Sequence, residues 1–319
     1  MSYEIRRQRG IATVYDPRTG ETMHPGAGPW AEANGLYVQG AGLPALLGTC
    51  GAQAVVIFDV GLGAAANALA ALACRQALAR RVPAPRPLHI VSFERDLDGV
   101  RLALEQAAAL AYPLGHEAAL QALLEAGRWQ GEGITWELRL GDFSALIDQE
   151  PQRADAIFFD PFSPQANPEM WTLPVLEALY RCRRLRTPTR LLTYSASYGT
   201  RAALLLAGFF VGEGPQPAHG GHSSMASTWF ADLPAPLTPA WLRRWRRQAQ
   251  PWPVGSDPRQ RRAMRAALQE HSQWLQFGQG APADEEGADA EPRAGRARPA
   301  ARRGPRGRDS APPGRRRRR

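Results

Sequence analysis

The chain has 319 residues, 44% of them hydrophobic, and a formal net charge of +9 at pH 7. This composition is sufficient to build the core of one α/β domain with extensions. No apolar run approaches the roughly 20 residues of a membrane span, and the first residues lack the apolar segment of a secretory signal. We therefore expect a cytoplasmic protein without a membrane partner.

The positive charge lies mainly at the end of the chain, and arginine carries all of it. Residues 277–319 contain twelve arginines and six acids, and no lysine occurs anywhere. Guanidinium groups suit bidentate phosphate contacts, although genomic base composition is the simpler explanation. The three cysteines, Cys50, Cys74 and Cys182, are far apart and the six histidines show no zinc-ligand spacing, so we expect reduced thiols and no metal site.

In chain order, residues 1–50 are rich in glycine and proline and are predicted to form an N-terminal cap of hairpin and loop. Residues 51–232 then alternate short apolar runs with alanine- and leucine-rich segments of helical length. This βαβ alternation predicts an α/β domain with a mostly parallel, doubly wound sheet covered by helices on both faces. The expected strands are Ala54–Val60, Leu88–Phe93, Thr135–Leu140, Ala154–Phe159 and Arg190–Tyr194, with Phe209–Val211 and Ala226–Phe230 as weaker ones; the expected helices are Ala64–Arg80, Leu97–Ala111, Glu117–Ala126, Pro174–Cys182 and Thr200–Ala207.

Residues 233–276 are predicted to form a helical extension. A proline-rich linker, Leu233–Pro239, precedes two expected helices, Pro239–Gln248 and Pro258–Gln276. Residues 277–319 combine glycine, proline, alanine, arginine and acids without periodicity, and we expect a disordered arginine-rich tail.

The first expected strand of the α/β domain ends at a glycine-rich turn. Gly61 and Gly63 follow it and lead directly into a helix that contains Asn67. Glycines at such a turn let a ligand approach the backbone, and the helix N-terminus offers unpaired N–H groups. A turn that binds no ligand has the same pattern, so the neighbouring strands decide between the two.

Four successive strands of the expected sheet end in or beside an acidic residue. These residues are Asp59, Glu94, Asp142 and Asp160. An acid after the second strand reaches the ribose hydroxyls of a nucleoside ligand. A group of carboxylates at one sheet edge repels phosphates and suits a cationic nucleoside without phosphate. The pattern therefore favours S-adenosylmethionine, which has a sulfonium, an ammonium and a ribose diol, with Gly61, Gly63 and Asn67 beside it.

Asp160 stands at the start of a stiff loop. The prolines of this loop continue neither a strand nor a long helix, so they hold it over the carboxylate. We expect Asp160 to face the acceptor of the transferred group, and Phe162, Pro164 and Trp171 to wall the acceptor pocket, although plain core packing fits these aromatic residues equally well.

These residues resemble those of a known family, the methyltransferase module of the MnmC-type enzymes, which complete the 5-methylaminomethyl group of the tRNA wobble uridine. The resemblance covers about Gly20 to Phe230 and is most specific in Asp160-x-Phe162-x-Pro164-x-x-Asn167-Pro168-x-Met170-Trp171-Thr172. The other matching segments are Gly20-Glu21-Thr22, Glu32–Leu43, Phe93-Glu94, Ser195-Ala196, Arg201 and Ala207-Gly208-Phe209. The chain has no segment long enough for the flavin-binding oxidase module that follows the methyltransferase in the bifunctional enzymes.

The resemblance implies a Rossmann-like methyltransferase fold, S-adenosylmethionine as donor and an aminomethyl nitrogen of tRNA as acceptor. It implies that Asp160 is catalytic and that Phe162, Pro164, Trp171 and Ser195 bind the substrate. The chain departs from the family at Ala65, where a third glycine is expected, and at Ala41, where an asparagine is expected. It also has Gly220-Gly221-His222-Ser223-Ser224-Met225 where family members carry a basic cluster.

Two other readings of the sequence stay open. One is an aminopropyltransferase of the polyamine-synthase type, which uses a related donor and the same fold, but the segment Asn167-Pro168-Glu169-Met170-Trp171 argues against it. The other is a catalytically inactive, methyltransferase-like RNA-binding protein, which the three departures from the family suggest. Binding of S-adenosylmethionine separates an active enzyme from an inactive module.

Overall fold

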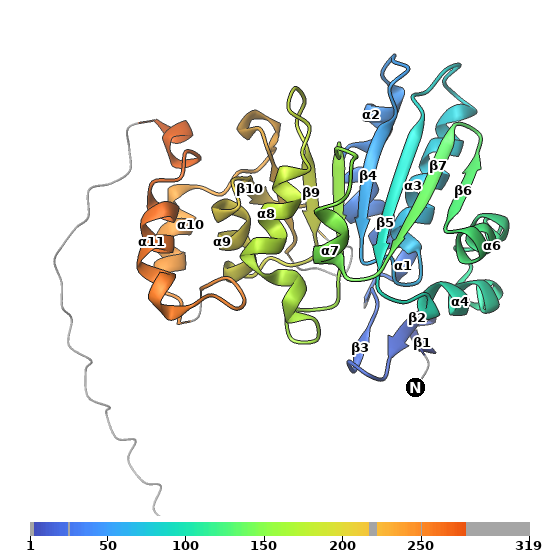
Figure 1. Ribbon diagram of the computed structural model, residues 1–319, viewed down its shortest axis with the longest axis horizontal. Coiled ribbons are helices and arrows are strands. Elements are labelled where there is room, and N and C mark those ends of the chain that lie inside the picture. The colour runs from blue at the N-terminus through green and yellow to red at the C-terminus, as the bar shows by residue number, and fades with distance from the viewer. Residues whose placement is uncertain (1–2, 25, 217–221, 250, 279–319) are drawn as a thin grey trace, which may run out of the picture. The chain divides into compact units, whose positions relative to one another are not determined.

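We describe the protein from a computed structural model that covers residues 3–24, 26–216, 222–249 and 251–278. Apart from its first two residues, the expected tail of residues 277–319 lies outside these ranges. The described residues belong to one compact unit that contains a central sheet, helices on both of its faces, a small N-terminal sheet and two C-terminal helices (Figure 1).

The central sheet has eight strands in the order β10-β11-β9-β8-β4-β5-β7-β6. The five strands from β9 to β7 in this order are parallel, while β10, β11 and β6 pair antiparallel at the two edges. The expected mostly parallel, Rossmann-like sheet is confirmed. The strands are β4 (Val55–Val60), β5 (Leu88–Glu94), β6 (Arg128–Gly131), β7 (Ile134–Leu140), β8 (Ala156–Phe159), β9 (Arg190–Thr193), β10 (Phe210–Glu213) and β11 (Ser224–Ser227).

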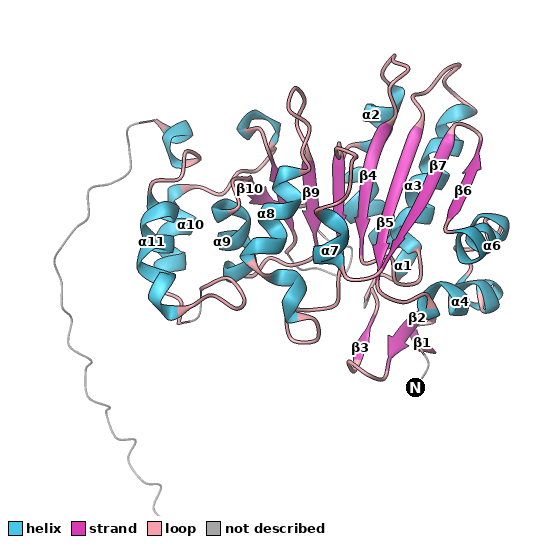
Figure 2. Cartoon of the chain, in the orientation of Figure 1, coloured by secondary structure: helices cyan, strands magenta, loops and turns pink. Residues whose placement is uncertain are grey.

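Helices cover both faces of this sheet, as Figure 2 shows. Side chains alternate along β4, so Val55 and Ile57 join one hydrophobic core and Val56 and Phe58 join the other. The first core packs against α1 (Pro29–Glu32), a π-helix (Ala33–Gln39), α2 (Leu43–Gly48), α3 (Ala66–Ala79), α4 (Asp98–Glu105), α5 (Ala107–Leu110) and α6 (Glu117–Ala126), and the second against α7 (Phe143–Ile147), α8 (Leu173–Arg181) and α9 (Tyr198–Leu206).

The structure differs from the expected elements within residues 97–147. The single helix expected over Leu97–Ala111 is divided at Gln106, whose φ of −107° and ψ of 24° end α4 at Glu105, and α5 follows up to Leu110. β6 was not expected; it forms a hairpin with β7 through the turn Glu132-Gly133, whose φ values are positive. α7 was not expected either, and it begins where the Asp142 side chain accepts a hydrogen bond from the amide of Ala145 at 3.1 Å.

A small antiparallel sheet forms the N-terminus. It consists of β1 (Glu4–Gln8), β2 (Ile11–Asp16) and β3 (Glu21–Thr22), and a turn at Arg9-Gly10 with positive φ values joins the first two strands. In Figure 1 this sheet lies below the carboxyl ends of the central strands. The chain that leaves β3 therefore reaches the edge of the central sheet where ligands bind in open α/β folds.

The C-terminal helices α10 (Pro239–Arg246) and α11 (Arg261–Gln269) pack onto the domain beside α9. Trp241 and Trp245 of α10 are buried in the second core. After α11, the buried Gln273 amide replaces a missing strand partner: its Oε1 accepts from the Val211 amide at 2.7 Å, and its Nε2 donates to the Val211 carbonyl at 2.8 Å. The helix expected over Pro258–Gln276 is thus interrupted after Gln269, where this buried contact begins.

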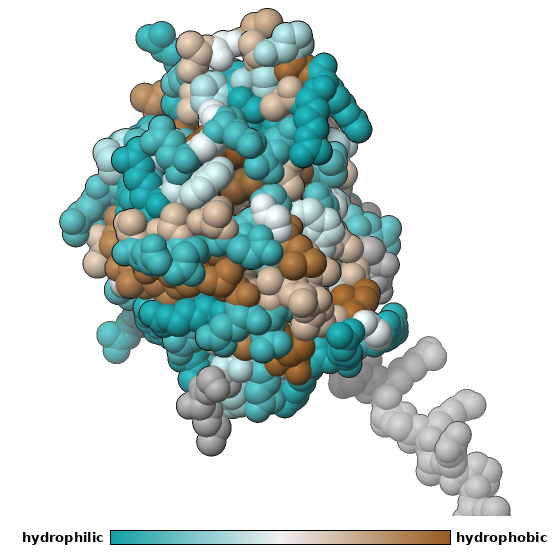
Figure 3. Space-filling model, turned by 90° about the vertical axis from the view of Figure 1, so that its right-hand side faces the viewer, coloured by the Kyte–Doolittle hydropathy of each residue, from teal (hydrophilic) through white to brown (hydrophobic). Residues whose placement is uncertain are grey.

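The surface of the described residues mixes polar and apolar side chains. Figure 3 shows this on the face beyond β6 and α6, where hydrophobic groups are separated by hydrophilic ones. Leu114 and Leu140 are among the exposed large hydrophobic residues, at 52% and 53% exposure. Within the described ranges, no helix has the length and apolar character needed to cross a membrane.

Ala65 holds a conformation that costs free energy for a residue with a side chain. It is fully buried before α3, and its φ is 65° and its ψ 17°, in the left-handed region. We expect Ala65→Gly to raise the free energy of unfolding by about 1 kcal/mol, measured by urea denaturation. Ala70→Gly, in the middle of α3, is the control and should lower it by about 1 kcal/mol. A stability loss in Ala65→Gly would contradict strain at this position.

Candidate active site

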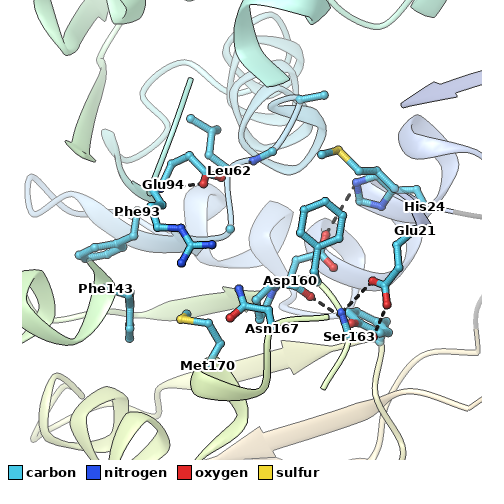
Figure 4. Close-up of a pocket in the computed structure, with 18 of the residues that line it drawn as sticks. Glu21, His24, Leu62, Phe93, Glu94, Phe143, Asp160, Ser163, Asn167 and Met170 are labelled. Atoms are coloured by element: carbon cyan, nitrogen blue, oxygen red, sulfur yellow. Dashed lines mark hydrogen bonds and ion pairs between the residues drawn. The ribbon is translucent and has the colours of Figure 1, made fainter. Parts of the chain in front are cut away.

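A cavity of about 520 Å³ opens at the carboxyl ends of β4, β5, β7 and β8 (Figure 4). Its wall combines the glycine turn after β4, the ends of β5 and β7, the loop after β8 and the segment between β3 and α1. The parallel strands bring these segments together because their carboxyl ends share one edge of the sheet. Of the residues predicted from the sequence, Gly61, Gly63, Glu94, Asp142, Asp160 and Phe162 line the cavity.

Gly61 permits the close approach of two loops at the floor of the cavity. Its φ is +88°, and a Cβ at this position would lie 2.7 Å from the main-chain oxygen of Asp160. Any side chain here would therefore push the glycine turn and the Asp160 loop apart. Gly63, with a φ of +53°, continues the turn and lies against Met23.

Glu94 fixes the glycine turn from the end of β5. Its Oε2 accepts from the amide of Gly63 at 2.8 Å, and its Oε1 accepts from the amide of Arg95 at 2.7 Å. Burial raises the pKa of the Glu94 carboxyl, while the hydrogen bond from Gly63 lowers it. Because each carboxylate oxygen has a second lone pair, Glu94 retains acceptor capacity toward a ligand in the cavity.

Asp142 lines the cavity beside Glu94, at the end of β7. Its side chain caps α7, so its orientation is set by the helix it begins. The amide of Gly141 donates to the main-chain oxygen of Glu94 at 2.9 Å, which keeps the two strand ends together.

Asp59 lies behind the wall of the cavity. Its side chain is buried under the sheet and accepts a hydrogen bond from the Ser92 hydroxyl at 2.7 Å, and Ser92 in turn accepts from the Trp136 indole at 2.9 Å. Burial raises the pKa of Asp59 to about 7. Asp59 therefore does not line the cavity, where the sequence predicts it beside the cofactor. It lies within β4, one residue before the strand ends, and its side chain is buried against Ser92 of β5.

Asp160 projects into the cavity from the loop after β8. Its Oδ2 accepts from the Asn67 amide nitrogen at 2.7 Å and lies 3.7 Å from the Nε2 of His24. Burial raises the pKa of Asp160 to about 6, while the positive charge of His24 lowers it. Asn67 therefore acts on the site from behind Asp160, since it does not itself belong to the wall formed by the described residues.

His24 joins two buried carboxylates at one end of the cavity. Its Nδ1 lies 3.7 Å from the Oε1 of Glu32, opposite its contact with Asp160. Burial disfavours the charged imidazole, but Asp160 and Glu32 outweigh this and raise the pKa of His24 to about 8. At pH 7 His24 is therefore mainly protonated, and it balances part of the negative charge around Asp160.

The first residues of the loop after Asp160 are held by hydrogen bonds from two other segments of the chain. The Ser163 amide donates to Glu21 Oε2 at 3.0 Å, and the Ser163 hydroxyl donates to the other oxygen of the same carboxylate. The Tyr194 hydroxyl donates to the Pro161 carbonyl at 3.0 Å. β3 and β9 thereby hold the loop over the cavity, in addition to the prolines that the sequence analysis identified.

Three predicted substrate-binding residues support the site from outside its described wall. Trp171 is 1% exposed and donates from its indole to the Phe162 carbonyl at 2.8 Å. Pro164 belongs to the same loop but not to the cavity wall. Ser195 is buried in the turn before α9, with its hydroxyl 3.0 Å from that of Thr200.

The sequence analysis assigned no role to Glu21, Glu32 or Tyr194. Glu21 and Glu32 lie in the segments that carry the family resemblance, so those segments were the available signal. Tyr194 ends an expected strand, as a core residue also does, and no pattern distinguished it. Within the described ranges, no group of three histidine, cysteine, aspartate or glutamate side chains is arranged to hold a metal ion.

Comparison with known proteins agrees with the fold. Residues 107–229 match a family described as S-adenosyl-L-methionine-dependent methyltransferases. The chain is 32% identical over 215 residues to the tRNA 5-methylaminomethyl-2-thiouridine biosynthesis bifunctional protein MnmC of Paracidovorax citrulli, a match that covers 64% of this chain and 32% of that protein. The protein of the same name from Cupriavidus metallidurans is 32% identical over 230 residues, with 69% and 33% of the two chains covered.

The chain spans about a third of the length of the curated relatives it matches. Among solved structures, MnmC2 from Aquifex aeolicus superposes with a TM-score of 0.62 at 24% identity, over 83% of each chain. That likeness confirms the Rossmann-like fold. By sequence and by fold, this chain matches the methyltransferase module of the MnmC proteins.

Proposed function

We propose that this protein is an S-adenosylmethionine-dependent N-methyltransferase that acts on the 5-aminomethyl group of the tRNA wobble uridine. The observation that carries the proposal is one cavity with the glycine turn and Glu94 at the donor side and Asp160 at the acceptor side. The matched relatives are named for biosynthesis of 5-methylaminomethyl-2-thiouridine in tRNA, which supports this acceptor. The enzyme would work in the cytoplasm, with residues 51–232 as its methyltransferase domain.

The charge of the cavity suits S-adenosylmethionine. Six acids line it, whereas Arg95 is its only arginine among the described residues. A phosphate-bearing cofactor would be repelled by these acids, while a sulfonium and an ammonium are attracted. Glu94 would accept hydrogen bonds from the ribose hydroxyls and Asp142 would lie at the nucleoside end. The acids are Glu21, Glu32, Glu94, Asp142, Asp160 and Glu169.

The bound donor supplies an electrophilic methyl group, and the protein must present a neutral amine in line with it. Asp160 would accept a hydrogen bond from the amine and would take one proton from its nitrogen as the methyl group passes from the donor sulfur, which leaves a neutral secondary amine and the thioether of the donor. A carboxylate whose pKa is raised to about 6 is a stronger base than an exposed one, and it is still mainly ionised at pH 7. Phe162 and Met170, which line the cavity, would exclude water around the reacting atoms.

His24 is expected to set the pH range of the reaction. Transfer requires ionised Asp160, so the rate should rise with pH through about 6, the pKa of Asp160. Because protonated His24 lowers that pKa, His24→Gln should move the acidic limb of the kcat profile to higher pH by about one unit. The rate at alkaline pH should change little. His116→Gln, outside the cavity wall, is the control, and an unshifted limb in His24→Gln would remove His24 from this role.

Single-turnover methylation of tRNA bearing 5-aminomethyluridine, followed by mass spectrometry of the nucleosides, tests the proposed function. The expected product is 5-methylaminomethyluridine. Transfer of an aminopropyl group from decarboxylated S-adenosylmethionine to putrescine would instead establish the aminopropyltransferase. Tight binding of RNA without binding of S-adenosylmethionine would establish the inactive RNA-binding module.

A further inference from the structure

The two C-terminal helices carry an unusual excess of arginine. Between Pro239 and Gln269 the sequence has eight arginines and a single acid, Asp257. This region follows the segment that matches the methyltransferase family, which ends at residue 229. The methyltransferase core therefore does not account for this charge.

The apolar faces of both helices are already used within the domain. Trp241 and Trp245 of α10 are 2% and 1% exposed, and Leu268 of α11 is fully buried. Trp241 stacks on Trp274, with ring centroids 6.4 Å apart. The faces that remain outside are polar, so these helices do not present an amphipathic surface for insertion into a lipid layer.

The outward guanidinium groups form no ion pairs within the described residues. Arg243 and Arg244 in α10, Arg247 directly after it, Arg259 before α11 and Arg262 within α11 are exposed, and the guanidinium of none of them lies within 4.0 Å of a carboxylate in the described ranges. Asp257 instead accepts from the main-chain amide of Arg259 at 2.8 Å. Buried arginines of the same domain are paired instead, as in the bidentate contact of Arg201 with Glu213. Five unpaired cations on neighbouring helices form a surface that attracts a polyanion.

This arginine surface, defined by Arg243, Arg244, Arg247, Arg259 and Arg262, is connected to the cavity wall through the loop between the two helices. The loop between α10 and α11 pairs with the domain at Thr172, through a bridge to Val254. Thr172 directly follows the short 3-10 helix Pro168–Trp171, in which Glu169 and Met170 line the cavity. The guanidiniums of Arg261 and Arg265 in α11 lie 5.5 and 5.7 Å from the ring of Trp252 in that loop, and the ring of Trp245 in α10 lies 5.1 Å from the same ring, so both helices contact the loop.

We infer that the arginine surface of α10 and α11 binds the phosphate backbone of the RNA whose base enters the cavity. The inference rests on the proposed function for the identity of the RNA. A cavity lined by six acids cannot hold a phosphate backbone, so the affinity for the rest of the nucleic acid must come from a separate basic surface. Guanidinium groups form bidentate contacts with phosphate, and such contacts position the RNA without reading its sequence.

The test is a matched pair of triple variants of the full chain. In the first, Arg243, Arg244 and Arg262 are changed to Gln. In the control, Arg80, Arg81 and Arg186 are changed to Gln; these arginines are exposed and lie at the amino ends of the strands, away from the cavity. Both variants lose three charges, so a difference between them reports position and not net charge.

We expect the first variant to bind tRNA about tenfold or more weakly at low salt, with the slope of log affinity against log salt reduced by about one for each lost contact. Its KM for tRNA should rise while kcat and the affinity for S-adenosylmethionine stay unchanged. The control variant should bind tRNA like the wild type. Equal losses in both variants, or no loss in the first, would overturn the inference.

Two further results keep this inference separable from the proposed function. If the wild type binds tRNA through these arginines but methylates none, the surface stands and the proposed acceptor is wrong. Vesicles of phosphatidylserine and phosphatidylcholine test a lipid partner. Loss of vesicle binding in the first variant, with tRNA binding unchanged, would assign the surface to a membrane and overturn the inference.

Discussion

Asp160→Asn is expected to slow methyl transfer about a hundredfold or more, the usual contribution of a positioned acid or base. The amide keeps the shape of the side chain and the contact with Asn67, which lies 2.7 Å from Asp160 Oδ2. It removes the negative charge that orients the amine and accepts its proton. Affinity for S-adenosylmethionine should change little, because Asp160 lies across the cavity from Glu94.

Single-turnover transfer to tRNA bearing 5-aminomethyluridine measures this effect, together with calorimetric titration of the donor on the same variant. Glu169→Gln is the matched control: it removes another carboxylate from the cavity wall, one whose side chain is 55% exposed. The control should transfer within a few-fold of the wild type. Transfer at the wild-type rate by Asp160→Asn would show that another group activates the amine.

Glu94→Ala is expected to weaken binding of S-adenosylmethionine by about 10- to 150-fold, which corresponds to roughly 1.5 to 3 kcal/mol for hydrogen bonds to a charged group. Two losses combine in this variant. The ribose hydroxyls lose their acceptor, and the Gly63 amide loses the carboxylate oxygen that it now contacts at 2.8 Å. The glycine turn should therefore lose order as well as its ligand.

Calorimetry measures the affinity, and circular dichroism confirms that the variant folds. Glu94→Gln separates the two losses, since the amide oxygen still accepts from Gly63 while the charge is gone, and it should bind more tightly than Glu94→Ala. Glu105→Gln, exposed on α4, is the surface control and should bind like the wild type. Unchanged affinity in a folded Glu94→Ala would exclude Glu94 from the donor site.

Local sequence determined most of the central sheet. Each expected strand is present within a few residues of its expected bounds, because a strand buried on both faces has a nearly continuous apolar sequence. β6 and α7 escaped prediction for the opposite reason. β6 lies at an edge with exposed and half-buried residues, and α7 has only five residues, so neither has a periodicity that stands out.

The candidate site also contains residues that were predictable from the sequence and residues that were not. An acid at the last residue of a parallel strand or just beyond it lies at the carboxyl edge of the sheet, so the positions of Glu94, Asp142 and Asp160 at the cavity were predictable from the sequence. Asp59 shows the limit of that rule. It lies one residue before the end of β4. Its side chain is therefore on one face of the sheet, where it contacts Ser92 of the neighbouring strand, and not at the edge.

The sequence by itself therefore determined the Rossmann-like sheet, the glycine turn and the line of acids at its edge, because these depend on contacts between neighbours in the chain or on strand periodicity. Only the tertiary structure decided that His24 and Glu32, far from Asp160 in sequence, form a charged group with it. It also decided which face of α10 and α11 stays in water. Such contacts depend on how separate segments pack. Charged residues that meet only in the folded protein leave no local pattern in the sequence.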